Sequence, residues 1–147
     1  MSGWNAFQMM PTNRMSAPAY ESGYSMTYCV GLLLRDGLVM LADTRPNAGV
    51  DNIATFRKLQ VFEVPGERVV AIATAGNLAV TQAVTSHLLE GLPGPKGDVQ
   101  TDYTVPSMFE MAQFVGRAIR TVRERDAASL SADGGTFDCS LLLGGQI

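Results

Sequence analysis

The chain has 147 residues, of which 46% are hydrophobic and 17% are charged. This length and composition predict one globular domain with a buried core and exclude a largely disordered chain. A net charge of -3 and the lack of a lysine- and arginine-rich block argue against nucleic acid or an acidic membrane surface as a partner. No apolar run approaches the roughly 18 residues that a transmembrane helix needs, so we expect no membrane partner.

The two cysteines, Cys29 and Cys139, both lie within apolar runs. That pattern is typical of reduced, buried thiols rather than of a disulfide framework. The first 26 residues lack the basic start and the apolar core of a secretory signal. We therefore expect a cytoplasmic protein. His87 is the only histidine, so we expect no metal site.

Residues 1–26 contain five methionines and scattered proline, serine, glycine and asparagine, without a helical or strand period. This segment predicts a disordered leader, a pro-segment or an upstream extension, followed by one folded domain over residues 27–147. Met26 followed by Thr27 is itself a plausible start of the chain, because methionine is normally removed before a small residue.

Two apolar, β-rich segments follow, over residues 27–34 and 38–44. Arg35-Asp36-Gly37 between them predicts a three-residue hairpin loop with Gly37 in the left-handed conformation. Both faces of these strands are apolar, which favours a hairpin that is covered on both sides.

A second pair of strands is predicted over residues 57–64 and 68–75, around the turn signal Pro65-Gly66-Glu67. The hydrophobic period then changes to that of a helix. Asn77 is a suitable N-cap for this helix, and Gly91 is expected to end it.

A loop rich in proline and glycine leads to a second helix that begins at Ser107, where Glu110 completes a capping box. One stripe of this helix is apolar and is expected to face the core: Met108, Met111, Val115, Ile119 or Ala118, and Val122. A last apolar strand is predicted over residues 137–143. A buried strand so close to the end of the sequence is typical of an interrupted domain, so we expect the N-terminal portion of a larger fold.

The first hairpin brings two polar residues together. A three-residue loop places Thr27 opposite Arg45 and Cys29 opposite Asp43, with these side chains on one face. Thr27 and Asp43 are then diagonal neighbours, roughly 7–8 Å apart between backbones. A two-residue loop would invert the parity and turn Asp43 away.

A threonine can act as a nucleophile when it is the first residue of a chain. Its own α-amine, with an unperturbed pKa near 7.7–8.0, then accepts the hydroxyl proton. Such a site also needs a cation, an anion that holds the cation, and backbone N–H donors for the oxyanion. Lys58, Asp43 and Gly76 could supply these groups. Taken singly, Thr27 also fits an ordinary strand threonine, Asp43 a strand-end cap and Lys58 a solvated strand lysine.

Four segments in this order, T-Y-C-V-G, A-D-T-R, F-R-K-L and A-T-A-G-N-L-A, resemble the proteasome-type β-subunits, which are N-terminal-nucleophile threonine hydrolases. The resemblance is strongest to the bacterial ancestral β-subunit group, Anbu, and covers residues 27–147. It implies an α+β fold, the αββα sandwich, truncated here after the first strands and two helices. It also implies self-association into a ring-like or helical oligomer.

The resemblance further implies a peptide or protein substrate and no cofactor. It assigns six residues: Thr27 as the nucleophile, Asp43 as the acidic partner, Lys58 as the catalytic lysine, Arg45 as the arginine two residues after the aspartate, Asn47 as a substrate contact and Gly76 as an oxyanion-hole glycine. The family's helper serine and second aspartate would lie beyond Ile147.

Two functions fit the sequence. One is a threonine-type peptidase or amidohydrolase subunit, which Thr27, Asp43 and Lys58 favour. The other is a non-catalytic assembly or scaffold subunit of the same fold, which the residues before Thr27 and the early end of the sequence favour. The sequence does not indicate whether an unfoldase partner delivers substrate.

Overall fold

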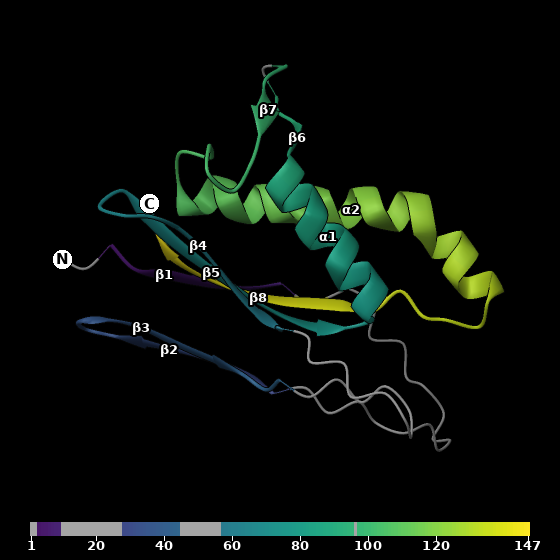
Figure 1. Ribbon diagram of the computed structural model, residues 1–147, viewed down its shortest axis with the longest axis horizontal. Helices are drawn as coiled ribbons and strands as arrows, with labels where there is room; N and C mark the ends of the chain where they lie inside the picture. Colours follow the sequence, from purple (N-terminus) through teal and green to yellow (C-terminus); the bar gives the residue numbers. More distant parts are fainter. Residues whose placement is uncertain (1–2, 10–27, 45–56, 96) are drawn as a thin grey trace.

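The computed structural model describes residues 3–9, 28–44, 57–95 and 97–147. These residues form three layers, which are a pair of helices, a four-stranded sheet and a two-stranded hairpin (Figure 1). The helices α1 (Leu78–Glu90) and α2 (Met108–Ala132) cover one face of the larger sheet, and the hairpin lies on the opposite face. Neither helix is long and apolar enough to cross a membrane.

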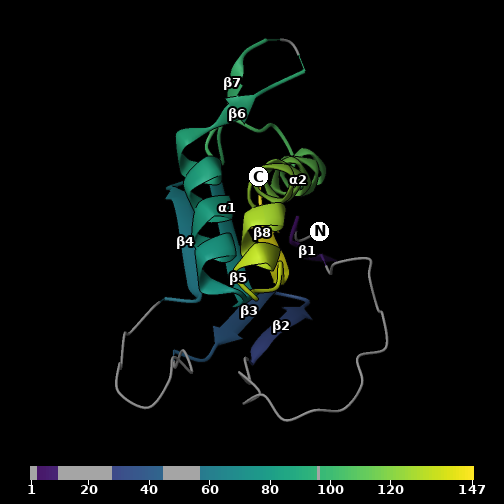
Figure 2. The same cartoon turned by 90° about the vertical axis from the view of Figure 1, so that its right-hand side faces the viewer.

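The larger sheet is antiparallel, with the strand order β1-β8-β5-β4. Its members are β1 (Asn5–Met9), β8 (Cys139–Gln146), β5 (Arg68–Gly76) and β4 (Leu59–Val64). Figure 2 shows β1 and β4 at opposite edges of this sheet. The predicted turn between β4 and β5 is confirmed, since Val64 pairs with Arg68 and Gly66 has a φ of 79°.

The core lies between this sheet and the two helices, and the predicted helix starts are confirmed. The side chain of Asn77 accepts hydrogen bonds from the N–H groups of Ala79 and Val80, and Ser107 Oγ accepts one from Glu110 N–H. Each cap satisfies donors that the first helical turn leaves unpaired. The apolar stripe of α2 is buried, with Ala118 rather than Ile119 at its centre.

Strand β1 is a departure from the expected disorder of the leader. Its five residues pair with β8 in an antiparallel register, from Asn5 opposite Gly145 to Met9 opposite Leu141. Their composition gives little strand signal. Pairing with β8, rather than local β-propensity, therefore accounts for this strand. The wider assignment of residues 1–26 as a leader or upstream extension stays a prediction.

The smaller sheet is the hairpin of β2 (Cys29–Leu34) and β3 (Gly37–Ala42), and its predicted register is wrong by one residue. Leu34 pairs with Gly37, so the loop consists of Arg35 and Asp36 alone. Gly37 has no positive φ and belongs to β3. Because glycine adopts extended and left-handed conformations equally well, composition alone does not separate the two loop lengths.

One face of the hairpin packs on β8. A Cβ on Gly31 would lie 3.2 Å from Leu142 Cδ2, and one on Gly144 would lie 2.5 Å from Leu38 Cδ2. β8 is longer than predicted and includes its glycines, since the missing side chain of Gly144 makes room for the hairpin. At Gly145 a Cβ would lie 2.2 Å from the carbonyl oxygen of Val69. These glycines therefore permit close contact with the hairpin and with β5 rather than ending the strand.

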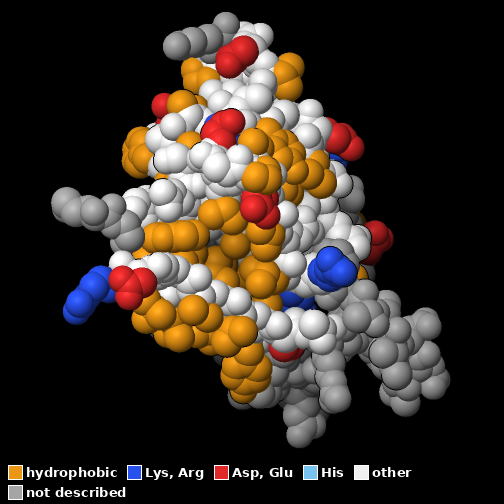
Figure 3. Space-filling view, turned by 60° about the vertical axis from the view of Figure 1, so that its left-hand side comes forward, with side chains coloured by type: hydrophobic (Ala, Val, Ile, Leu, Met, Phe, Trp, Pro, Cys, Tyr) orange, Lys and Arg blue, Asp and Glu red, His pale blue; other side chains and the backbone are white. Residues whose placement is uncertain are grey.

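The other face of the hairpin was expected to be covered, and the described residues leave it open. Its apolar side chains are between 40% and 60% exposed: Val30, Leu32, Leu34, Val39 and Leu41. Figure 3 shows hydrophobic side chains gathered on the side of the molecule where the hairpin turn lies. An apolar face of this kind marks a surface that a further layer or a partner covers.

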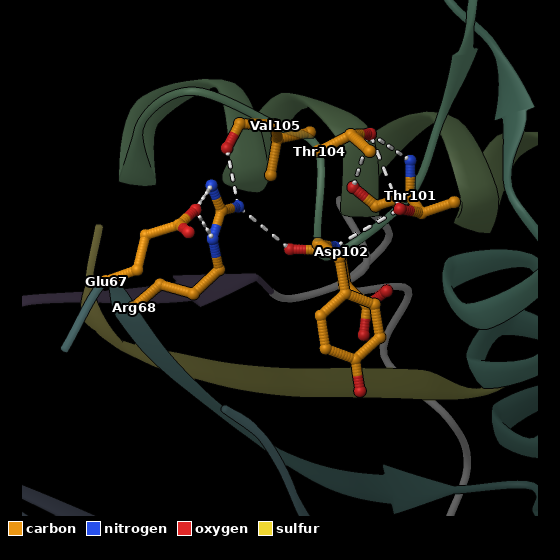
Figure 4. Close-up of polar contacts among 7 residues, drawn as sticks. Glu67, Arg68, Thr101, Asp102, Thr104 and Val105 are labelled. Atoms are coloured by element: carbon orange, nitrogen blue, oxygen red, sulfur yellow. Dashed lines mark hydrogen bonds and ion pairs between the residues drawn. The ribbon is translucent and has the colours of Figure 1, made fainter. Parts of the chain in front are cut away.

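The loop between the helices holds a buried acid. A short hairpin of β6 (Leu92–Pro93) and β7 (Val99–Gln100) leads to Asp102, which has no exposed surface. Arg68 donates to the carbonyl oxygens of Asp102 and Val105, but neither carboxylate oxygen of Asp102 has a hydrogen-bond partner (Figure 4). Burial raises the pKa of this carboxyl to about 6, although nearby backbone N–H groups and the charge of Arg68 oppose the shift.

Candidate active site

Asp43 and Lys58 form an ion pair between the hairpin and the larger sheet. Lys58 Nζ lies 2.9 Å from Asp43 Oδ1 and 3.0 Å from Oδ2. The side chain of Lys58 is 8% exposed and that of Asp43 is 27% exposed. Lys58 is therefore a buried cation held by a carboxylate and not a solvated strand lysine. A buried lysine needs such a partner, because desolvation of an unpaired ammonium is costly.

The position of Asp43 corrects the register argument. The loop has two residues, yet the carboxylate faces Lys58 and does not turn away. Because β3 ends at Ala42, the side chain of Asp43 does not have to follow the alternating side-chain directions of a strand. Its N–H donates to the carbonyl oxygen of Tyr28 at 3.0 Å, and its Oδ1 accepts the N–H of Tyr28 at 3.2 Å.

This second contact relates the ion pair to residue 27. The N–H of Tyr28 belongs to the peptide bond that joins Thr27 to Tyr28. This N–H and Lys58 Nζ donate to the same oxygen of Asp43, so the two nitrogen atoms lie within two hydrogen-bond lengths of each other. Thr27 itself lies outside the described residues, as do Arg45 and Asn47. Their predicted roles stay predictions.

The electrostatics of the pair favour the charged carboxylate. Burial by itself would raise the pKa of Asp43. The hydrogen bond and charge of Lys58, together with the N–H of Tyr28, outweigh burial and hold this pKa below its usual value. Asp43 is thus an anion at neutral pH, which keeps a counter-charge beside the ammonium of Lys58.

Thr74 is a site residue that the sequence interpretation missed. Its N–H donates to the carbonyl oxygen of Lys58 at 2.8 Å, and its Oγ1 lies 3.3 Å from the same oxygen. The backbone of Lys58 is therefore fixed to β5. A single hydroxyl within the otherwise apolar run R-V-V-A-I-A-T-A was the available signal, because a buried hydroxyl needs a partner.

Cys29 is a free thiol that lies beside Thr74. Its Sγ is 3.8 Å from the carbonyl oxygen of Thr74. Burial, followed by the charge of Asp43, raises the pKa of Cys29. Burial also raises the pKa of Cys139, to about 11, with a further contribution from Asp138. Both cysteines are free, and neither has the lowered pKa of a nucleophilic thiolate.

Gly76 ends β5, directly before the N-cap of α1. Its φ is 109°, and a Cβ would lie 2.5 Å from the carbonyl oxygen of Asp138. The N–H of Asn77 donates to that oxygen at 2.8 Å. Only glycine fits this junction, which lies two residues beyond Thr74. The suggested use of the Gly76 N–H for an oxyanion stays a prediction.

We expect Gly76→Ala to lower the free energy of unfolding by roughly 2–4 kcal/mol, because it adds a clash with backbone to a positive φ. Gly66→Ala is the matched control, since Gly66 has a φ of 79° but nothing within 4 Å of its Cβ position. That variant should lose only about 1–2 kcal/mol. Chemical denaturation of both variants measures the difference, and equal losses would show that the contact with Asp138 does not constrain Gly76.

The arrangement is suited to acyl-transfer chemistry at the start of β2. Lys58, its carboxylate partner Asp43 and the N–H of Tyr28 come together at the start of β2, and Thr74, which contacts Lys58, lies two residues before Gly76. Among the described residues, no group of three or more His, Cys, Asp or Glu side chains could hold a metal ion.

The solved structures that match this chain, given below, are all Anbu proteins. No protein-family model and no curated protein matches the chain. Solved structures do match, and each of the following covers 83% of this chain. Anbu (ancestral β-subunit) from Yersinia bercovieri is 43% identical with a TM-score of 0.68, and Anbu from Hyphomicrobium sp. strain MC1 is 43% identical with a TM-score of 0.66. The helical assembly of the Anbu complex from Pseudomonas aeruginosa is 42% identical with a TM-score of 0.69.

These similarities define the class of the chain as a proteasome-like β-subunit, with two helices and antiparallel sheets. The particular group is Anbu, so the resemblance seen in the sequence is confirmed. The chain spans about half the length of these structures, since it covers 48% of each.

Proposed function

We propose that the chain is part of a threonine-type peptidase or amidohydrolase subunit that acts within an oligomer and has the αββα sandwich as its complete fold. The observation that carries this proposal is the buried Lys58–Asp43 ion pair, whose carboxylate also accepts the N–H of Tyr28. A structural ion pair has no need to lie beside the start of β2, whereas a nucleophile at residue 27 needs a cation at that place.

In this proposal, removal of the preceding residues makes Thr27 the first residue. The positive charge of Lys58 lowers the pKa of the new α-amine, so that the amine is neutral and can accept a proton at neutral pH. Asp43 holds the ammonium group of Lys58 in place through the ion pair. The Thr27 hydroxyl then attacks a carbonyl carbon of the substrate as its proton passes to the α-amine.

The attack produces a tetrahedral oxyanion, for which the N–H of Gly76 is the proposed donor. The α-amine returns its proton to the leaving amine, which leaves an ester on Thr27 that water hydrolyses. Arg45 and Asn47 are proposed to position the substrate strand. No step requires a cofactor.

The second candidate function is a non-catalytic assembly subunit. The exposed apolar face of the hairpin favours it, as does the helical assembly of the Anbu complex from Pseudomonas aeruginosa. Self-association through that face requires no chemistry at Thr27. The two candidates therefore differ in what Thr27 does and not in whether the chain assembles.

Substitution of the nucleophile separates the candidates. We expect Thr27→Ala to abolish hydrolysis of a fluorogenic peptide library, while Thr27→Ser retains a measurable part because serine keeps a hydroxyl beside the α-amine. Each variant is compared for rate and for oligomer size by light scattering. Equal rates for the native chain and Thr27→Ala, or no rate in any preparation that begins at Thr27, would favour the assembly subunit.

A further inference from the structure

The segment 101–107 connects β7 to α2 and is hydrogen-bonded to α1 and to β5. The N–H of Asp102 donates to the carbonyl oxygen of Leu88, in the last turn of α1, at 3.2 Å. From β5, Arg68 Nη1 donates to the carbonyl oxygens of Asp102 at 3.3 Å and of Val105 at 2.9 Å (Figure 4). Val105 has no exposed surface and belongs to the core. Main-chain groups therefore fix this segment to the fold at Asp102 and Val105.

The side chain of Asp102 is enclosed at this point without a donor of its own. The residue has no exposed surface, and neither carboxylate oxygen accepts a hydrogen bond from a described residue. Two backbone N–H groups lie close to the carboxyl, but both have other acceptors. The N–H of Asp102 donates to Leu88, and the N–H of Tyr103 donates to Thr101 Oγ1 at 3.2 Å. Burial here costs less for the neutral carboxyl than for the carboxylate.

The charged groups of the adjoining elements do not offset this cost. Arg68 of β5 attracts the carboxylate, but its guanidinium group is shared between two carbonyl oxygens and the preceding glutamate, and burial outweighs its charge. Arg117 of α2 is bonded to a side chain of β7, and His87 of α1 acts on an acid of α2. The acids at the adjoining helix ends, Glu90 and Glu110, add negative charge and cannot stabilise a carboxylate.

We propose that Asp102 is a proton-operated latch on the segment 101–107. With its carboxyl protonated, the segment is closed on α1 and β5. Ionisation favours a local opening in which the carboxylate reaches water, while the sheets and both helices stay folded. The opening breaks the hydrogen bond to Leu88 and the two hydrogen bonds from Arg68. The latch lies at the end of α1 opposite to Gly76, and it does not rest on the proposed function.

Proton linkage gives the direction and the size of the effect. The pKa of Asp102 is about 6 in the closed segment, and an exposed aspartate has a pKa of roughly 3.9. The closed form therefore binds the proton more tightly than the open form, so a rise in pH through this window favours opening. These two values raise the equilibrium constant for opening roughly fiftyfold between pH 4 and pH 7.

Native-state hydrogen exchange of the full chain, followed by NMR, separates local opening from global unfolding. The amide of residue 102, bonded to Leu88, reports the segment. The amide of Ile72, in a strand between β4 and β8, reports unfolding of the larger sheet. After correction for intrinsic exchange, the amide of residue 102 should open more readily than that of Ile72, with a weaker dependence on denaturant. Its opening constant should rise roughly fiftyfold between pH 4 and pH 7.

Two variants and one titration complete the test. Asp102→Asn should remove the pH dependence of local opening, whereas Asp98→Asn, which changes an exposed acid of the same loop, should keep it. The carboxyl ¹³C shift of Asp102 in the native chain should titrate at about pH 6 and needs no variant. An amide of residue 102 that exchanges only together with that of Ile72 would overturn the latch. A pH dependence that persists in Asp102→Asn, or a carboxyl that titrates at the value of an exposed aspartate, would do the same.

Discussion

Lys58→Met is expected to destabilise the fold by roughly 2–3 kcal/mol and to abolish reaction at Thr27. The variant leaves the carboxylate of Asp43, in a partly buried position, with the N–H of Tyr28 but without its cationic partner. Removal of one member of a fully buried pair costs about 3–5 kcal/mol. We expect less here because the side chain of Asp43 keeps 27% of its surface exposed. Chemical denaturation near neutral pH measures the change.

A double-mutant cycle isolates the pair from the loss of each side chain. Asp43→Asn alone should also destabilise, and the combination with Lys58→Met should cost less than the two single changes together. Because the pKa of Asp43 is lowered in the fold, the stabilisation from this carboxylate is present above its unfolded pKa and is lost as the pH falls through the folded value. Strict additivity, or a pH profile unchanged by Asp43→Asn, would show that the pair is not coupled.

Asp102→Asn is expected to stabilise the chain at neutral pH by about 3 kcal/mol. The pKa of Asp102 is about 6 in the fold, against roughly 3.9 in an unfolded chain. The folded state therefore binds more protons than the unfolded state between these values, so the free energy of unfolding falls as the pH rises through this window. The asparagine variant has no charge to bury and escapes that loss.

Denaturation at pH 4 and at pH 7 tests this expectation. The native chain and Asp102→Asn should differ little at pH 4 and most at pH 7. Asp98→Asn is the matched control, because Asp98 is an exposed acid of the same loop. A variant that is less stable than the native chain at pH 7 would mean that the carboxylate has a favourable partner and is not an unpaired buried charge.

Much of the order of elements could be predicted from local signals. The turn at Gly66, the caps at Asn77 and Ser107 and the apolar stripe of α2 depend on neighbours within a few residues. Strand β1 and the extension of β8 through Gly144 depend on partners far away in the sequence. Their residues carry weak propensities, so no local pattern indicates them.

The residues of the candidate site also divide into those that the sequence indicated and those that only the fold shows. Asp43 and Lys58 were predicted because an N-terminal threonine site needs a cation and an anion that holds it, and the structure brings the two side chains together. The geometry that the hairpin register implied was wrong, since Asp43 lies beyond the last paired residue of β3. Thr74 was missed because a strand threonine has many ordinary uses, and only the fold shows that it contacts Lys58.

The chemical state of Thr27 tests the central claim most directly. Purified protein is treated with an electrophile that reacts with N-terminal threonine, and mass spectrometry locates the adduct and the first residue of the labelled chain. We predict a chain that begins at Thr27 and carries one adduct on that residue, with labelling lost in Lys58→Met. Intact protein that retains residues 1–26, or an adduct on Cys29 in place of Thr27, would contradict the account.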